Sequence, residues 1–160
     1  MEEILSLLTQ CAIPYEFVEH PALYHMEEGL TLPHPEAVAK NLFLKERKGG
    51  RYFLVTLPRN GGAEWNALRR FFQSGPLTMA SPEELKEILG LGLGSVTPFG
   101  LLKDAERRVE WGLSPFFRGK LIGIHPNRNT ATVYLAAQDL FRLLKQQGCR
   151  CRWLEEEPSR

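Results

Sequence analysis

One lysine stands at the start of an apolar run, where a cationic side chain could assist chemistry on an ester or a phosphate. Lys40 precedes Asn41-Leu42-Phe43-Leu44, at a point where the chain is expected to change direction. Its ammonium would then project from a strand end into a cleft and could stabilise developing negative charge. A solvated surface lysine is the competing interpretation. Asn41 favours the cleft, because an amide at the start of a buried strand must find hydrogen-bond partners.

Two further segments place polar groups in loops. Gly94-Ser95-Val96-Thr97-Pro98 sets a glycine and a proline around two hydroxyl side chains, which suits a loop that offers backbone amides and carbonyls to a ligand. A purely structural turn explains the same spacing. His125-Pro126-Asn127-Arg128-Asn129-Thr130 lies between two expected strands. Its histidine fits a base, a pocket wall or a hydrogen-bonded core residue, and these alternatives stay open.

Other chemistry-bearing residues show no catalytic or metal-binding spacing. The sequence contains no GxSxG, HExxH or GxxxxGK[ST] motif, and no GxGxxG that follows a strand and opens a helix. His20, His25 and His34 are scattered and are interpreted as loop histidines. The three cysteines include no CxxC pair, so neither a disulfide framework nor a zinc site is expected. The residues therefore call for no metal or cofactor.

The elements that must position these residues are short helices and strands. Apolar periodicity and capping patterns predict helices over 2–11, 63–72, 81–90 and 137–147, and a brief helix over 24–29. Strands are expected over 15–18, 41–44, 52–57, 108–113, 121–124, 130–135 and 149–154, with a further one beginning at 101–102. These elements alternate without a strict βαβ repeat, which indicates an α+β or mixed α/β fold.

Length and charge restrict the class of protein further. With 160 residues, of which 43 % are hydrophobic, the chain is expected to form a single domain over 1–160. Its net charge of +1 argues against extended binding of duplex DNA. The longest uncharged stretch, 88–102, is shorter than the roughly 20 apolar residues that cross a bilayer. The acidic N-terminus is unlike a signal peptide, so a cytoplasmic protein that does not enter membranes is expected.

Taken together, the three segments at Lys40, Gly94 and His125 resemble the YbaK-type family of aminoacyl-tRNA deacylases. This family includes the editing domain inserted in bacterial prolyl-tRNA synthetases, and the branch most similar to this chain is that of freestanding alanyl-tRNA(Pro) deacylases. The resemblance extends from Tyr15-Glu16-Phe17 and His20-Pro21 to Leu140. It implies a mixed, partly closed six- to seven-stranded sheet, flanked by helices, with its pocket among these segments.

The resemblance also implies residue roles. Lys40 matches the family's essential lysine, which engages the charged end of the substrate, and Asn41 matches the amide that follows it. His125 matches a residue that limits the size of the pocket. The remaining matches are the loop whose backbone positions the aminoacyl group and two residues that complete the last motif: Gly94, Ser95, Val96, Thr97 and Pro98, and Asn129 and Thr130.

The function implied is trans-editing, the hydrolysis of the ester of mischarged alanyl-tRNA(Pro) without a metal. A synthetase site shaped for proline cannot exclude alanine, because each missing methylene costs only about 1–3 kcal/mol, whereas a smaller second pocket can exclude proline. The implied partners are the acceptor end of aminoacyl-tRNA and prolyl-tRNA synthetase. A group of basic residues either contacts the acceptor end or forms a solvated turn: Lys45, Arg47, Lys48 and Arg51.

Some positions depart from the family's pattern. The segment 33–39 lacks the usual Pro-Gly before the lysine, the stretch 111–115 lacks the usual acid, and Asn127 stands where an aliphatic residue is common. These departures leave the amino-acid specificity open. Two alternative functions also stay open: a non-catalytic module that binds an amino acid or a tRNA end, and a small-molecule hydrolase unrelated to tRNA.

Overall fold

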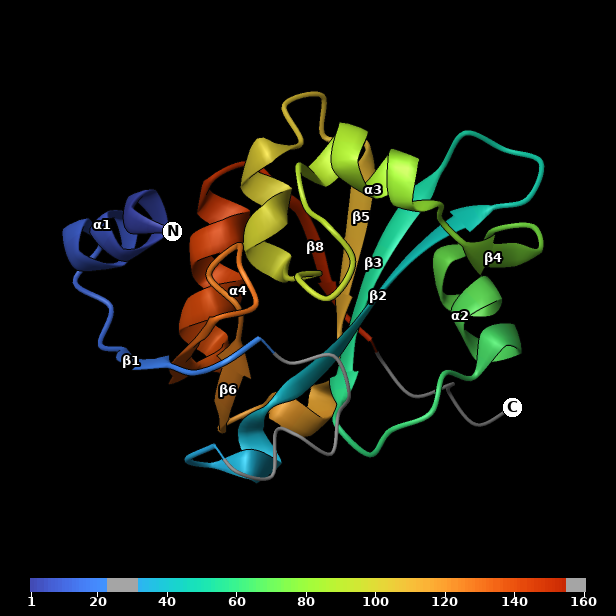
Figure 1. Cartoon of the computed structure of the whole chain (residues 1–160). Coiled ribbons are helices and arrows are strands. Elements are labelled where there is room, and N and C mark those ends of the chain that lie inside the picture. Colours follow the sequence, from blue (N-terminus) through green and yellow to red (C-terminus); the bar gives the residue numbers. More distant parts are fainter. Residues whose placement is uncertain (23–31, 155–160) are drawn as a thin grey trace.

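The larger of two sheets is built around a β-hairpin. The structure is a computed structural model that describes residues 1–22 and 32–154 (Figure 1). β2 (Ala39–Glu46) and β3 (Tyr52–Pro58) pair antiparallel within a sheet of order β4-β2-β3-β5-β8. One antiparallel and two parallel strands complete it: β4 (Leu77–Met79), β5 (Val109–Leu113) and β8 (Arg150–Trp153).

The smaller sheet brings the N-terminal strand against a hairpin from the C-terminal half of the chain. β1 (Glu16–Glu19) and β6 (Leu121–Ile124) lie antiparallel on either side of β7 (Ala131–Ala136). A single parallel bridge between Val38 and Gly123 joins this sheet to the segment that leads into β2. That bridge is the point at which the two sheets meet.

Helices cover the sheets in the described part of the chain. The α-helices are α1 (Glu2–Gln10), α2 (Trp65–Phe72), α3 (Pro82–Leu89) and α4 (Ala137–Gln146), and the short 3-10 helices are η2 (Pro35–Ala37), η3 (Pro98–Lys103) and η4 (Pro115–Phe117). The start of α3 is set by a capping box, in which Ser81 and Glu84 each accept a hydrogen bond from the other's backbone N–H. Gly90 ends it with a φ of +68°, a conformation that favours glycine.

The β2–β3 hairpin is buried on both faces. Phe43 and Leu54 belong to the main core, whereas Leu44 and Phe53 pack against Phe72 and its neighbours on α2. Alternation along the strands therefore sends successive side chains into two separate apolar clusters. This burial makes β2 a rigid support for any residue placed at its N-terminal end.

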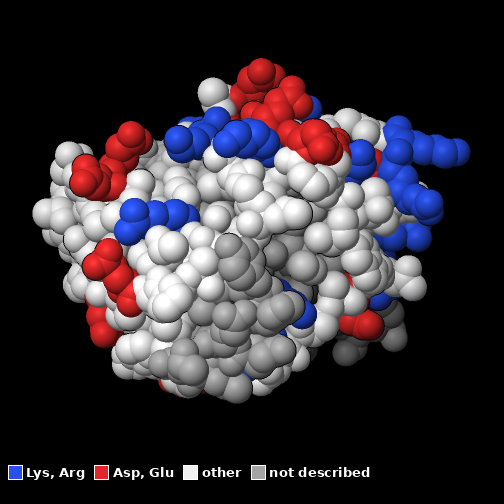
Figure 2. Space-filling view, viewed as in Figure 1, with Lys and Arg blue, Asp and Glu red and all other residues white. Residues whose placement is uncertain are grey.

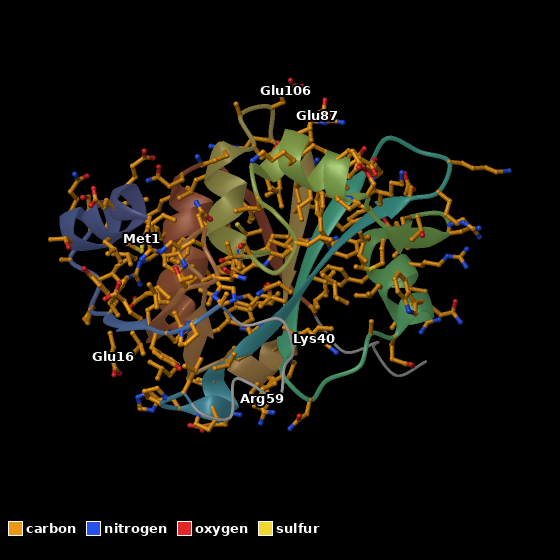
Figure 3. The ribbon with its side chains drawn as sticks, in the orientation of Figure 1. Met1, Glu16, Lys40, Arg59, Glu87 and Glu106 are labelled. Atoms are coloured by element: carbon orange, nitrogen blue, oxygen red, sulfur yellow. The ribbon has the colours of Figure 1, made fainter. Side chains whose placement is uncertain are left out.

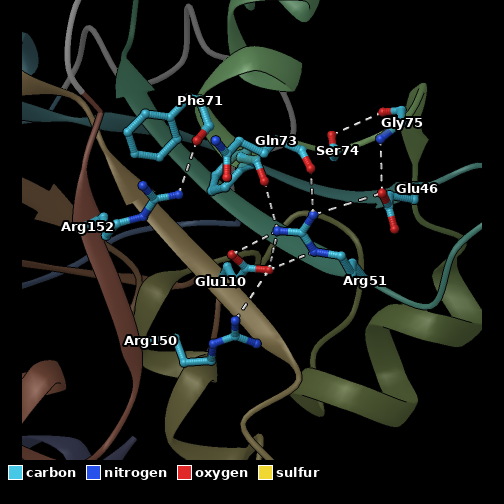
Figure 4. A network of polar contacts seen from close by, with 10 residues as sticks. Glu46, Arg51, Phe71, Gln73, Ser74, Gly75, Glu110, Arg150 and Arg152 are labelled. Carbon is cyan, nitrogen blue, oxygen red and sulfur yellow. Dashed lines mark hydrogen bonds and ion pairs between the residues drawn. The ribbon is translucent and has the colours of Figure 1, made fainter.

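A charged network clamps the C-terminus of α2 to the sheet (Figure 4). Arg51 donates to the Glu110 carboxylate from Nε and Nη2 at 3.1 and 2.9 Å. The same guanidinium donates to the carbonyl oxygens of Phe72 and Gln73 at 2.9 and 3.1 Å. Because helix ends leave carbonyls without intrahelical partners, this arginine satisfies two of them. Its charge is therefore used within the fold.

The structure confirms the mixed α+β class and most of the expected elements. The sheet differs from the expected single sheet of six to seven strands, since the described residues form eight strands in two open sheets. Pro126 lacks a backbone N–H and follows soon after the Val38–Gly123 bridge, so the parallel pairing does not continue there.

Three segments either differ from the expected elements or lie outside the described residues. The strand predicted to begin at 101–102 is wrong: these residues lie in η3, which Pro98 at its first position and the Thr97 side chain initiate. β4 was not predicted, because three residues show too little alternation to reveal an edge strand. The helix expected over 24–29 lies outside the described residues.

Packing between β6 and β7 requires a residue without a side chain at position 123. A Cβ added to Gly123 would lie 2.7 Å from Cε1 of the buried Tyr134 ring. We expect Gly123→Ala to lower the free energy of unfolding by about 1–3 kcal/mol, the usual cost of overpacking. Gly50→Ala is the matched control, since nothing lies within 4 Å of its added Cβ. Equal urea midpoints for the two variants would contradict the close packing.

Candidate active site

One face at the junction of the two sheets carries several residues that could do chemistry. Val38 and Gly123 pair in parallel, so their two segments leave the bridge in the same direction. Because alternate residues of an extended chain share a face, Lys40 and His125 follow on that same face. The strand register places residues of β1 and β7 on this face as well, beside those of β6. We call this surface the site face: Val18, His20, Val38, Lys40, Gly123, His125, Thr132 and Tyr134.

Lys40 supplies the positive charge of the site face. Its side chain is half-buried and makes no hydrogen bond or ion pair with the described residues. Figure 3 shows it near the N-terminal end of β2, and in the same orientation Figure 2 shows a hollow right of centre with basic atoms inside it. A half-buried ammonium without a counter-charge can bind an anionic group at little cost in competing contacts.

Asn41 lies on the opposite face of β2 from Lys40. Its Oδ1 accepts a hydrogen bond of 2.6 Å from the hydroxyl of Thr56, its register partner on β3. The Thr56 oxygen in turn accepts from Trp111 Nε1–H at 2.9 Å. The amide oxygen of Asn41 therefore anchors β2 to β3 and β5, next to the lysine.

His125 is held in one tautomer. Its Nδ1 lies 2.9 Å from the carbonyl oxygen of Ala131, which can only accept, so Nδ1 carries the proton. Burial lowers the pKa of the imidazole, and the nearby His20 lowers it further. His125 is therefore neutral near pH 7, and its Nε2 is an acceptor.

The loop of residues 94–98 is tied to the same histidine. The Thr97 hydroxyl donates to the carbonyl oxygen of His125 at 2.6 Å and accepts from the Phe99 N–H at 3.4 Å. Gly94 has a φ of +86°, which a residue with a side chain rarely adopts. Ser95 closes the turn by donating its N–H to the Gly92 carbonyl at 3.1 Å. His125 thus contacts this loop and follows the strand that bridges to the Lys40 segment.

The remaining predicted residues are supports or neighbours of this arrangement. Val96 packs against the main core, and Pro98 is buried as the first residue of η3. Asn129 and Thr130 are half-buried in the β6–β7 turn, where the Thr130 carbonyl accepts the His20 N–H at 3.0 Å. Asn127 has a φ of +66°, which asparagine tolerates, and lines a separate cavity of about 300 Å³ beside α1.

His20 lies directly after β1 and outside any strand, as expected of a loop histidine, and it also belongs to the site face. Its Nε2 lies 2.8 Å from the Thr132 hydroxyl, and its ring centroid lies 6.1 Å from that of His125. Its position directly after a strand was the available signal, but the sequence does not show which strand is its partner. His34 instead makes an exposed contact with Glu16, and His25 lies outside the described residues.

Two of the four residues in the predicted basic group form ion pairs within the fold. Lys45 contacts Glu84 at 3.0 Å, and Arg51 is bound to Glu110. Arg47 and Lys48 are exposed in the β2–β3 turn. Figure 2 shows basic side chains gathered at the right edge of the molecule. The charge that remains open to a polyanion is therefore smaller than the sequence indicates.

The described residues contain neither a candidate metal site nor a helix that could cross a membrane. Residues 1–22 and 32–154 contain no group of three His, Cys, Asp or Glu side chains that could hold a metal ion. The helices within these ranges are too short or too polar to cross a bilayer.

Comparison with known proteins identifies the family. The family model "Aminoacyl-tRNA editing domain" matches residues 20–143. The prolyl-tRNA editing protein ProX of Acetoanaerobium sticklandii is 31 % identical over 150 residues, covering 92 % of each chain. The prolyl-tRNA synthetase associated domain-containing protein 1 of Bos taurus is 35 % identical over 150 residues, covering 88 % of this chain and 86 % of its own.

Solved structures share the fold. A crystal structure of the hypothetical protein APE2540 has a TM-score of 0.74 at 14 % identity and covers 96 % of this chain and 99 % of its own. A candidate trans-editing enzyme for prolyl tRNA synthetase has a TM-score of 0.72 at 21 % identity, covering 98 % and 96 %. With a family model that spans most of the sequence and relatives above 30 % identity along nearly all of it, this chain belongs to the aminoacyl-tRNA editing domain family.

Proposed function

We propose that residues 1–160 act as one trans-editing domain in the cytoplasm, which hydrolyses the ester of mischarged alanyl-tRNA(Pro) without a metal. The observation that carries this proposal is the half-buried Lys40 ammonium, which has no counter-charge among the described residues and shares a face with the neutral His125. The names of two relatives refer to prolyl-tRNA editing and to prolyl-tRNA synthetase, which supports tRNA(Pro) as the tRNA of the substrate.

The chemistry requires positioning more than a strong nucleophile. Water attacks the ester carbonyl carbon, negative charge develops on the carbonyl oxygen, and the bond to the ribose oxygen breaks as that oxygen takes up a proton. Lys40 binds the terminal phosphate or the ester region and stabilises the charge that develops nearby. The backbone of the loop 94–98 orients the aminoacyl group, and holding the reacting groups together supplies much of the rate.

Selection by size completes the proposal. His125 forms a wall that leaves room for the methyl group of alanine and excludes the ring of proline. Its hydrogen bond to Ala131 and the Thr97 bond to its own carbonyl keep this wall in place. A pocket that rejects a larger side chain by steric overlap discriminates more strongly than one that only loses contacts with a smaller side chain.

Removal of the cation tests the central role of Lys40. We expect Lys40→Ala to lower kcat/KM for alanyl-tRNA(Pro) by about 100-fold or more, as the loss of a charge-stabilising donor does elsewhere. Lys86→Ala is the control, because that lysine lies in the last turn of α3, away from the site face. The readout is release of labelled alanine from purified tRNA. Undiminished release by Lys40→Ala would remove the residue on which the proposal rests.

A Thr97 variant tests the hydrogen bond between the loop 94–98 and His125. Thr97→Val keeps the shape but removes the hydroxyl that donates to the His125 carbonyl. We expect about a tenfold fall in kcat/KM, while Thr97→Ser keeps most activity. The two variants are compared by deacylation kinetics at a temperature where circular dichroism shows both to be folded. Equal activity of Val and Ser variants would show that the hydroxyl does not position the loop.

A panel of tRNA(Pro) carrying alanine, serine or proline tests the specificity. We expect alanine to be released fastest, proline to be retained, and a chelator such as EDTA to leave the rate unchanged. Stoichiometric binding of alanyl-tRNA(Pro) without turnover would instead favour a binding module. Equal hydrolysis of simple alanine esters would favour a hydrolase unrelated to tRNA. Loss of activity in the chelator, restored by a divalent metal, would contradict the metal-free reaction.

A further inference from the structure

Three contacts tie the end of β1 to the β6–β7 turn and the start of β7. The His20 backbone N–H donates to the Thr130 carbonyl at 3.0 Å. The His20 imidazole contacts the Thr132 hydroxyl at 2.8 Å, across 112 residues of sequence. Glu19 and Arg128 form an ion pair of 3.5 Å beside them. These contacts hold His20 against the segment that follows His125.

The orientation of the His20 ring is fixed at both nitrogens. Its Nδ1 lies 2.8 Å from the Pro21 carbonyl oxygen, which can only accept, so Nδ1 is protonated. In the neutral ring, Nε2 is then the acceptor for the Thr132 hydroxyl. Thr132 is only 1 % exposed, so losing this acceptor would leave a buried hydroxyl unsatisfied. The pair thus has one favourable arrangement.

The fixed ring lies against His125. The two ring centroids are 6.1 Å apart with an interplanar angle of 51°, within the range of contacting aromatic side chains. Ala131 holds the Nδ1 edge of His125 and Thr97 holds its carbonyl oxygen. His20 therefore limits movement of the His125 ring along the site face.

We propose that His20 is a positioning residue of the editing site, which acts with Thr132 to fix the His125 imidazole as the wall that measures the aminoacyl side chain. This inference rests on the proposed function, and it assigns His20 no contact with the reacting atoms. Without His20, the His125 ring gains freedom and the pocket admits larger side chains. Selectivity then falls more than the rate on alanine.

The experiment compares His20→Ala, Thr132→Val and Thr132→Ser with the wild-type protein. Thr132→Val removes the hydroxyl at constant shape, and Thr132→Ser restores it. Lys86→Ala is again the control, because that lysine lies in the last turn of α3, away from the site face. The first readout is the ratio of kcat/KM for alanyl-tRNA(Pro) over prolyl-tRNA(Pro). The second is the ¹⁵N spectrum of the His125 imidazole, which reports its tautomer and mobility without substrate.

We expect the ratio to fall about tenfold in His20→Ala and Thr132→Val, and to stay near the wild-type value in Thr132→Ser and Lys86→Ala. The His125 signal should broaden or lose its Nδ1–H character in the first two variants only. A purely structural role would lower the unfolding midpoint with the ratio and the His125 signal unchanged, and would overturn the inference. If the wild-type protein does not deacylate, the proposed function fails, while an unaltered His125 signal in His20→Ala alone overturns the positioning role.

Discussion

The close packing of the Tyr134 ring against the bare backbone of Gly123 is the interaction on which the site depends. Gly123 leaves room for that ring and also forms, among the described residues, the isolated bridge to Val38 at which the two sheets meet. From that bridge, the segments that carry Lys40 and His125 run onward together. A residue with a side chain at position 123 would force the ring or the bridge to move, and the cation and the histidine would move with it.

Charge placement distinguishes Lys40 from the basic residues that form ion pairs within the fold. Lys45 and Arg51 contact Glu84 and Glu110, so their charges are largely cancelled within the fold. Lys40 is half-buried yet has no such partner among the described residues. Burying a charge without a partner is costly, which sets Lys40 apart from these two residues. This contrast, more than the modest net charge, supports the proposal that an anionic substrate binds at Lys40.

The sequence predicted the parts of the fold that depend on local signals. The strand over 121–124 and the helix that begins after Ser81 follow from alternation and capping, which act over a few residues. The contact between His20 and Thr132 was not predicted, because Thr132 lies far along the chain and strand pairing at that distance leaves no local pattern. The division into two sheets that meet at the isolated Val38–Gly123 bridge arises from pairing between distant segments, which leaves no local pattern either. Lys40 was singled out by the family resemblance, which carries long-range information that periodicity lacks, and its role stays a prediction.

The most direct test of the account is binding of an unreactive substrate analogue, adenosine carrying alanine through a 3′-amide, followed by NMR on the labelled protein. We expect the largest shifts at the Lys40 side chain, the amides of the loop 94–98 and the His125 ring, with little change in the cavity beside α1 that Asn127 and Lys103 line. Shifts confined to that cavity or to the β2–β3 turn, with Lys40 and His125 unmoved by saturating analogue, would contradict it.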